Sequence, residues 1–105
     1  MPTQLESAFE EEMRIIYNIW KTEFKYNASR FIQMIEKDGG LNAAKALLAN
    51  KNHHEGLTRL WEEKRLDVSM EAIILKETWC TLFSSIELGI ASKRLKELGY
   101  QKVSN

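Results

Sequence analysis

Apolar residues recur every three or four positions along about residues 3 to 25, which is the spacing of one face of an α-helix. Arg14, Asn18 and Lys21 fall on the opposite side. The pattern predicts a long amphipathic helix at the N-terminal end of the chain. Its apolar face is expected to contain Leu5, Phe9, Met13, Ile16, Trp20 and Phe24.

The apolar arc of this first helix is wide. Ala8, Ile15, Tyr17 and Ile19 stand beside the main repeat and widen the arc to roughly 200°, about twice the stripe that a surface helix needs. One flank is therefore expected to pack on a second copy of the chain in a homodimer. The candidate partner-binding residues are Ile15, Tyr17 and Ile19. The alternative is that neighbouring helices of the same chain cover both flanks.

Five shorter helices are expected after the first one, over about residues 28–37, 41–49, 55–64, 70–76 and 84–98. Asn27 can cap the second helix, and Asp67 or Ser69 the fifth, because short polar side chains accept hydrogen bonds from free helix N–H groups. Most connections are short, so the helices must pack together. The expected fold class is all-α, a compact bundle of about five or six helices with a long N-terminal helix. The residues expected to be mostly buried are Phe9, Met13, Ile16, Phe31, Ile35, Leu60, Ile74, Leu95 and Leu98.

The last helix carries the clearest local signals. Ser84 and Glu87 have the spacing of a capping box, and Gly99 is placed to stop the helix. Cations near the C-terminal end complement the helix dipole. They are Lys93, Arg94 and Lys96. Gly89 is the one glycine that falls inside a helical pattern.

The composition is that of an ordinary globular protein, with 44% hydrophobic and 29% charged residues among 105. Residues 1–105 are expected to form a single helical domain. The 15 basic and 15 acidic residues cancel, so no global field favours nucleic acid or anionic lipid. No apolar run approaches the ~18 to 20 residues that span a bilayer. The lone Cys80, together with an acidic rather than basic N-terminal region, predicts a cytoplasmic protein.

Side chains with catalytic or metal-binding chemistry do not form a recognisable pattern. His53-His54-Glu55 lacks the HExxH spacing and a third ligand, so a metal site is not expected. Cys80 has no base assigned to it, and Glu62 and Glu63 point in different directions on a helix. The sequence therefore predicts a non-enzymatic protein with no catalytic residue, no metal and no cofactor.

Aromatic and basic residues come together near the end of the fourth predicted helix. They are Arg59, Trp61, Lys64 and Arg65, a mixture that can grip a single strand or a phosphate backbone. Glu62 and Glu63 are interleaved with them and weaken the pattern. These four residues are the candidate site if the chain binds nucleic acid.

Four segments resemble a small bacterial helical module that occurs alone or as a C-terminal tail and has no known activity. They are Tyr26-Asn27-Ala28-Ser29-Arg30-Phe31, Gly39-Gly40-Leu41, Gly56-Leu57-Thr58-Arg59-Leu60-Trp61 and Arg65-Leu66-Asp67-Val68-Ser69-Met70-Glu71-Ala72. The resemblance implies a helical bacterial protein and carries over no catalytic residue. It departs at Trp61-Glu62-Glu63-Lys64, where a small or apolar residue is expected after Trp-Glu.

The leading functional hypothesis is a non-enzymatic interaction module that binds a protein partner or itself, without contact to a membrane. The alternative is a nucleic-acid or nucleotide-binding protein, such as one in phage or defence biology. Steep salt dependence of oligonucleotide binding would favour the alternative, because phosphate contacts release counterions.

Overall fold

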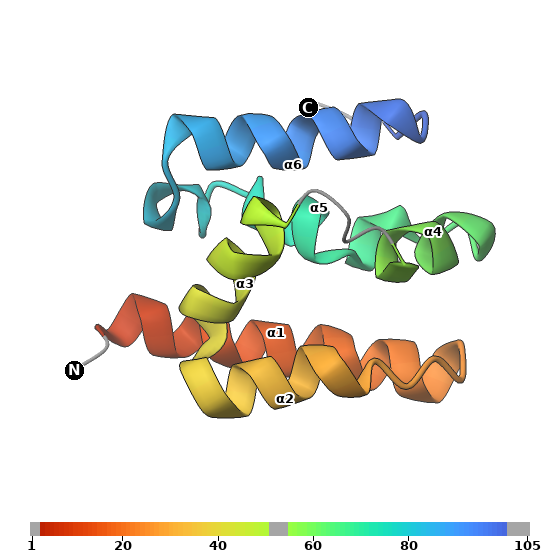
Figure 1. The fold of residues 1–105 in the computed structure, drawn as a ribbon, viewed down its shortest axis with the longest axis horizontal. Helices are drawn as coiled ribbons and strands as arrows, with labels where there is room; N and C mark the ends of the chain where they lie inside the picture. The colour runs from red at the N-terminus through yellow and green to blue at the C-terminus, as the bar shows by residue number, and fades with distance from the viewer. Residues whose placement is uncertain (1–2, 51–54, 101–105) are drawn as a thin grey trace. The chain divides into compact units, whose positions relative to one another are not determined.

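The computed structural model describes residues 3–50 and 55–100, which fold into α-helices and short 3₁₀ segments without any strand (Figure 1). The all-α class predicted from the sequence is confirmed. The α-helices are α1 (Gln4–Glu23), α2 (Ser29–Asp38), α3 (Gly40–Ala49), α4 (Glu55–Glu62), α5 (Met70–Ile74) and α6 (Ser85–Glu97). The 3₁₀ segments are η1 (Leu66–Val68) and η2 (Cys80–Leu82). The longest helix is α1, with 20 residues, as predicted.

The chain divides into two compact units, Met1–His53 with α1 to α3 and His54–Asn105 with α4 to α6. Within the first unit α3 packs against both α1 and α2, and within the second α5 packs against α6. The single domain expected for residues 1–105 stays a prediction. No helix in the described ranges is long and apolar enough to cross a membrane.

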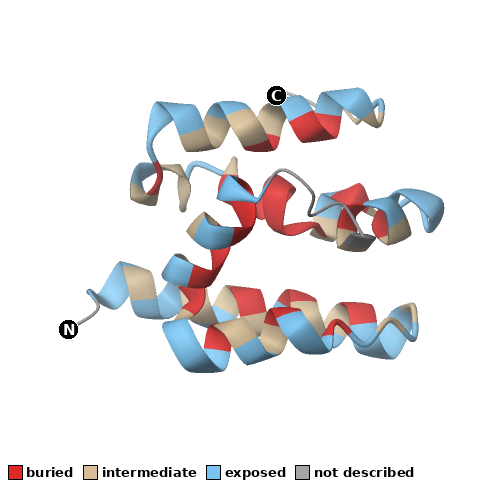
Figure 2. Cartoon of the chain, in the orientation of Figure 1, coloured by how far each residue is buried: buried red, intermediate tan, exposed pale blue. Residues whose placement is uncertain are grey.

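Thr3 starts α1 by accepting a hydrogen bond from the Glu6 backbone N–H at 3.1 Å. One side of the helix is then buried, as Figure 2 shows, and the remaining sides are partly or fully exposed. The buried residues are Phe9, Met13, Ile16 and Trp20, which follow the predicted spacing. Trp20 also stacks at a tilt on Phe31 of α2, with ring centroids 4.9 Å apart.

The cap predicted for α2 is wrong. Its N-cap is Ala28, which has no side-chain oxygen, and the Asn27 side chain instead accepts a hydrogen bond from Tyr17 at 2.8 Å. A long-range partner thus outcompetes the local capping role that the sequence favoured.

Gly39 and Gly40 join α2 to α3 in a turn that other residues fit poorly. Gly39 has φ 86° and ψ 157°, a region that is essentially restricted to glycine. A Cβ on Gly40 would lie 2.5 Å from the Glu10 Cα, so the start of α3 lies directly against the α1 backbone. The double glycine therefore serves both the turn and the close approach of two helices.

In the second unit, α4 ends two residues earlier than predicted. Lys64 adopts φ 60°, the left-handed conformation, and its N–H donates to the Trp61 carbonyl at 3.0 Å. The Arg65 N–H donates to the Leu60 carbonyl at 2.8 Å, which completes a Schellman motif with lysine at the usual glycine position. Gly99 occupies the same position after α6, with φ 80°.

Local caps begin the last two α-helices. Ser69 caps α5 by accepting from the Ala72 N–H, and Ser84 and Glu87 form the predicted capping box of α6. Between them, Glu71 of α5 and Arg94 of α6 form a buried ion pair at 3.1 Å. Eight of the nine core residues predicted from the sequence are buried. Leu98 is half-buried, because it lies at the C-cap, beyond the last turn of α6.

Candidate interaction surfaces

The outer flank of α1 exposes apolar side chains in the middle of a long helix. Ile15 is 45% exposed, whereas Phe9 and Met13 on the buried side are 0% exposed. Ala8 is also exposed, and Ile19 is half-buried. Ala8, Ile15 and Ile19 lie within about 40° of one another at ~100° per residue, so they form one stripe. We call this stripe, together with Glu11 and Glu12 beside it, the α1 outer flank.

Tyr17 does not belong to the α1 outer flank. At ~100° per residue it lies about 200° from Ile15, on the other side of the buried face. Its hydroxyl donates to the Asn27 carboxamide oxygen at 2.8 Å, which ties α1 to the segment before α2. The structure therefore brings Ile15 and Ile19 together and places Tyr17 apart from them.

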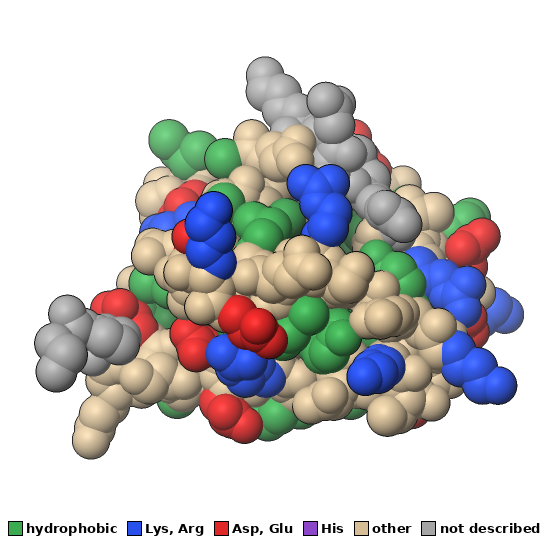
Figure 3. Space-filling view, turned by 60° about the horizontal axis from the view of Figure 1, so that its bottom comes forward, with side chains coloured by type: hydrophobic (Ala, Val, Ile, Leu, Met, Phe, Trp, Pro, Cys, Tyr) green, Lys and Arg blue, Asp and Glu red, His purple; other side chains and the backbone are tan. Residues whose placement is uncertain are grey.

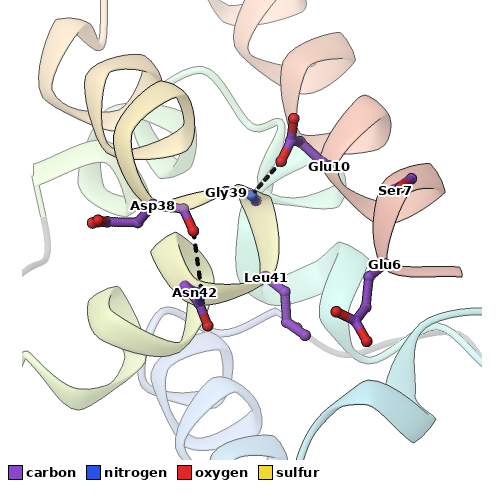
Figure 4. A pocket seen from close by; sticks show the side chains of 8 residues that line it. Glu6, Ser7, Glu10, Asp38, Gly39, Leu41 and Asn42 are labelled. Atoms are coloured by element: carbon purple, nitrogen blue, oxygen red, sulfur yellow. Dashed lines mark hydrogen bonds between the residues drawn. The ribbon is translucent and has the colours of Figure 1, made fainter. Parts of the chain in front are cut away.

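An acidic pocket of about 480 Å³ lies between the first turns of α1 and the junction of α2 with α3 (Figure 4). It is lined by Glu6, Ser7, Glu10, Asp38, Gly39, Gly40, Leu41 and Asn42. Glu10 accepts a hydrogen bond from the Gly40 N–H at 2.8 Å and forms an ion pair with Arg14 at 3.4 Å. Figure 4 shows the Asp38 carboxylate turned outward, while the Asp38 carbonyl accepts from Asn42.

The chemistry of this pocket favours a cationic group over an anion. The N-terminus of α3 would attract an anion through its free N–H groups, but the Glu10 carboxylate already occupies that position. Glu6 is bonded to Thr3, and the lining residues include no lysine or arginine. The sequence did not reveal this pocket, because Glu10 and Gly40 are 30 positions apart.

The basic residues at the end of α4 are largely neutralised by their neighbours. Arg59 pairs with Glu63 at 3.4 Å, and Arg65 pairs with Asp67 at 3.1 Å. Trp61 is 49% exposed, and Lys64 is exposed beside it. Figure 3 turns the bottom of Figure 1 forward, and on the face that it shows Lys and Arg side chains also lie among Asp and Glu side chains, so mixed charge is not confined to the end of α4. With both arginines paired to carboxylates, the exposed Trp61 has, among the described residues, only Lys64 beside it to bind a phosphate, which is a weak arrangement.

The outward side of α6 carries a shallow hollow lined by Gly89, Ser92, Lys93, Lys96 and Glu97. Ile86 lies on the same side of the helix and is 75% exposed. We call Ile86, Gly89, Lys93 and Lys96 the α6 outer face. In the sequence, the signal for this surface is Gly89, which falls inside a helical pattern.

The remaining chemical candidates offer little. Cys80 is half-buried, with its Sγ 3.7 Å from the Glu77 carbonyl oxygen. His53 and His54 lie outside the described residues. Among the residues that are described, no group of three or more histidine, cysteine, aspartate or glutamate side chains could hold a metal ion.

Comparisons with protein-family models, with curated proteins and with solved structures gave no match to this chain. The resemblance to a bacterial helical module therefore stays a prediction.

Proposed function

We propose that the chain is a non-enzymatic, cytoplasmic interaction module that binds a second copy of itself through the α1 outer flank. The observation that carries the proposal is Ile15, which is 45% exposed midway along a helix whose opposite side is closed to solvent. Burying the part of Ile15 that is still exposed would contribute roughly 1 kcal/mol. Ile19, one turn further along, extends the same apolar stripe.

A protein partner fits this surface better than a nucleic acid does. Glu11 and Glu12 border the stripe, and carboxylates repel phosphates. The alternative site around Trp61 has three cations, Arg59, Lys64 and Arg65, but two of them are paired with acidic neighbours. Charge thus supports the protein-binding proposal on both surfaces.

Sedimentation velocity over a range of protein concentrations tests the proposal. The wild type is expected to form a homodimer, and Ile15→Glu is expected to weaken it by at least about tenfold, because a carboxylate would be buried in the contact. Gln33→Glu on the exposed surface of α2 is the matched control and should leave the dimer unchanged.

Two results would count against the proposal. One is a monomeric wild type at every concentration, and the other is an Ile15→Glu dimer as tight as that of the wild type. Oligonucleotide binding with a steep salt dependence would favour the nucleic-acid alternative instead.

A further inference from the structure

The α6 outer face has the properties of a helix-docking surface. Ile86, Gly89, Lys93 and Lys96 follow one another at intervals of three or four residues, so they share one side of the helix. Ile86 is the most exposed large apolar side chain of the described residues, at 75%. An apolar residue, a position without a side chain and two cations therefore lie in a row.

Gly89 is not explained by packing within the chain. A glycine inside a helix costs about 0.8 to 1 kcal/mol relative to alanine. A Cβ built on Gly89 would meet no atom of residues 3–50 and 55–100 within 4 Å, so none of the described elements requires the small residue. What Gly89 does provide is a place where another helix can approach the α6 backbone closely.

Lys93 and Lys96 are both exposed, and neither forms an ion pair within residues 3–50 and 55–100. The dipole of α6 accounts for cations in its last turn, which contains Arg94 and Lys96. Lys93 lies before that turn. The two lysines thus present positive charge to an outside partner.

We infer that the α6 outer face binds the α1 outer flank of a second copy, with the two helices antiparallel and Ile15 placed over Gly89. The inference rests on the proposed self-association and names the surface that receives α1. Each surface supplies what the other lacks. The α1 outer flank has a protruding isoleucine and two carboxylates. The α6 outer face has a hollow with two ammonium groups and one carboxylate, that of Glu97, so its net charge is positive.

The spacing along the two helices selects the antiparallel orientation. An α-helix rises about 1.5 Å per residue, so Glu11 lies about 6 Å before Ile15 and Lys93 lies about 6 Å after Gly89. With Ile15 over Gly89, Glu11 therefore faces Lys93 only when the two helices run in opposite directions. The same alignment places Ile19 beside Ile86, whereas a parallel alignment would place Ile19 beside Lys93.

The contact can be tested by reversing charges on one surface at a time. Lys93→Glu with Lys96→Glu, and separately Glu11→Lys with Glu12→Lys, each place like charges together and should raise the dimer dissociation constant at least tenfold. An equimolar mixture of the two variants should restore a heterodimer, because both of its α1–α6 contacts then join opposite charges. Circular dichroism checks that each variant is folded.

Gly89→Ala provides an uncharged second test. At a concentration at which the wild type is monomeric, alanine should raise the melting temperature, because it favours the helix and its Cβ meets no described atom within 4 Å. The same methyl group should weaken dimerisation by keeping Ile15 of the second copy away from the α6 backbone. A purely structural glycine would not show these opposite effects.

The outcomes separate this inference from the proposed function. Ile15→Glu could break the dimer while the charge variants and Gly89→Ala remain dimeric. In that case the α1 outer flank binds a surface of the second copy other than α6, and only the α6 contact is overturned. If each charge variant is monomeric and the mixture stays monomeric, the α6 contact is likewise overturned. A monomeric wild type overturns both proposals.

Discussion

Arg94→Met removes the cation from the buried ion pair with Glu71. The two side chains are only 6% and 5% exposed, and their atoms are 3.1 Å apart, so the substitution leaves the Glu71 carboxylate in a site that water scarcely reaches. Breaking such a pair from one side typically costs about 3 to 5 kcal/mol. Folded proteins are typically stable by about 5 to 15 kcal/mol, so the loss would be a large fraction of the total.

Urea unfolding followed by the helical circular dichroism signal measures this loss. Arg94→Met is expected to lower the free energy of unfolding by about 3 to 5 kcal/mol. Arg65→Met is the control, because the Arg65–Asp67 pair is exposed and should cost less than about 1 kcal/mol. The double variant Glu71→Leu with Arg94→Met should be more stable than Arg94→Met alone, because it removes the stranded charge.

Two results would refute this reasoning. One is a loss below about 1 kcal/mol for Arg94→Met, which would show that the site is open to water. The other is a double variant less stable than Arg94→Met, which would show that the Glu71 side chain is not stranded when Arg94 is replaced.

Three further stability predictions follow from backbone and core geometry. Gly40→Ala should cost about 1 to 3 kcal/mol in a thermal melt, because its Cβ would lie 2.5 Å from the Glu10 Cα. Lys64→Gly should raise the free energy of unfolding by about 0.5 to 1 kcal/mol. Glycine relieves the strain of the left-handed conformation, and this gain exceeds the cost of the larger chain entropy that glycine gives the unfolded state. Leu95→Ala should cost about 2 to 5 kcal/mol in a urea melt, because Leu95 is buried in α6; a loss below about 1 kcal/mol would contradict its core position.

Features set by neighbouring residues were predictable from the sequence. Four of the six residues on the predicted apolar face of α1 are buried, whereas Leu5 near its start is exposed and Phe24 at its C-cap is half-buried. The capping box at Ser84 and Glu87 predicted the start of α6. Both patterns depend on residues no more than a few turns apart, so helical periodicity and capping chemistry are enough to find them.

Features that depend on distant residues were not predictable. Asn27 is drawn away from capping by Tyr17, and Arg94 finds Glu71 23 positions earlier in the chain. The left-handed Lys64 breaks the usual preference for glycine, so α4 was expected to continue for two more residues. Tyr17 was grouped with Ile15 as a partner-binding residue, although ~100° per residue already places it about 200° from Ile15. The structure adds the hydrogen bond from Tyr17 to Asn27.

The hydrogen bond from the Gly40 N–H to Glu10 has a consequence for the order of folding. The N-cap of α3, Gly39, provides no side-chain hydrogen bond, and a helix of 10 residues is marginal by itself. The carboxylate that satisfies its first turn comes from α1, 30 positions earlier. We therefore expect α3 to form only when α1 is in place. Glu10→Ala removes the acceptor of the Gly40 N–H and should speed amide hydrogen exchange in α3 more than in α1. Equal acceleration in both helices would show that they open as one cooperative unit.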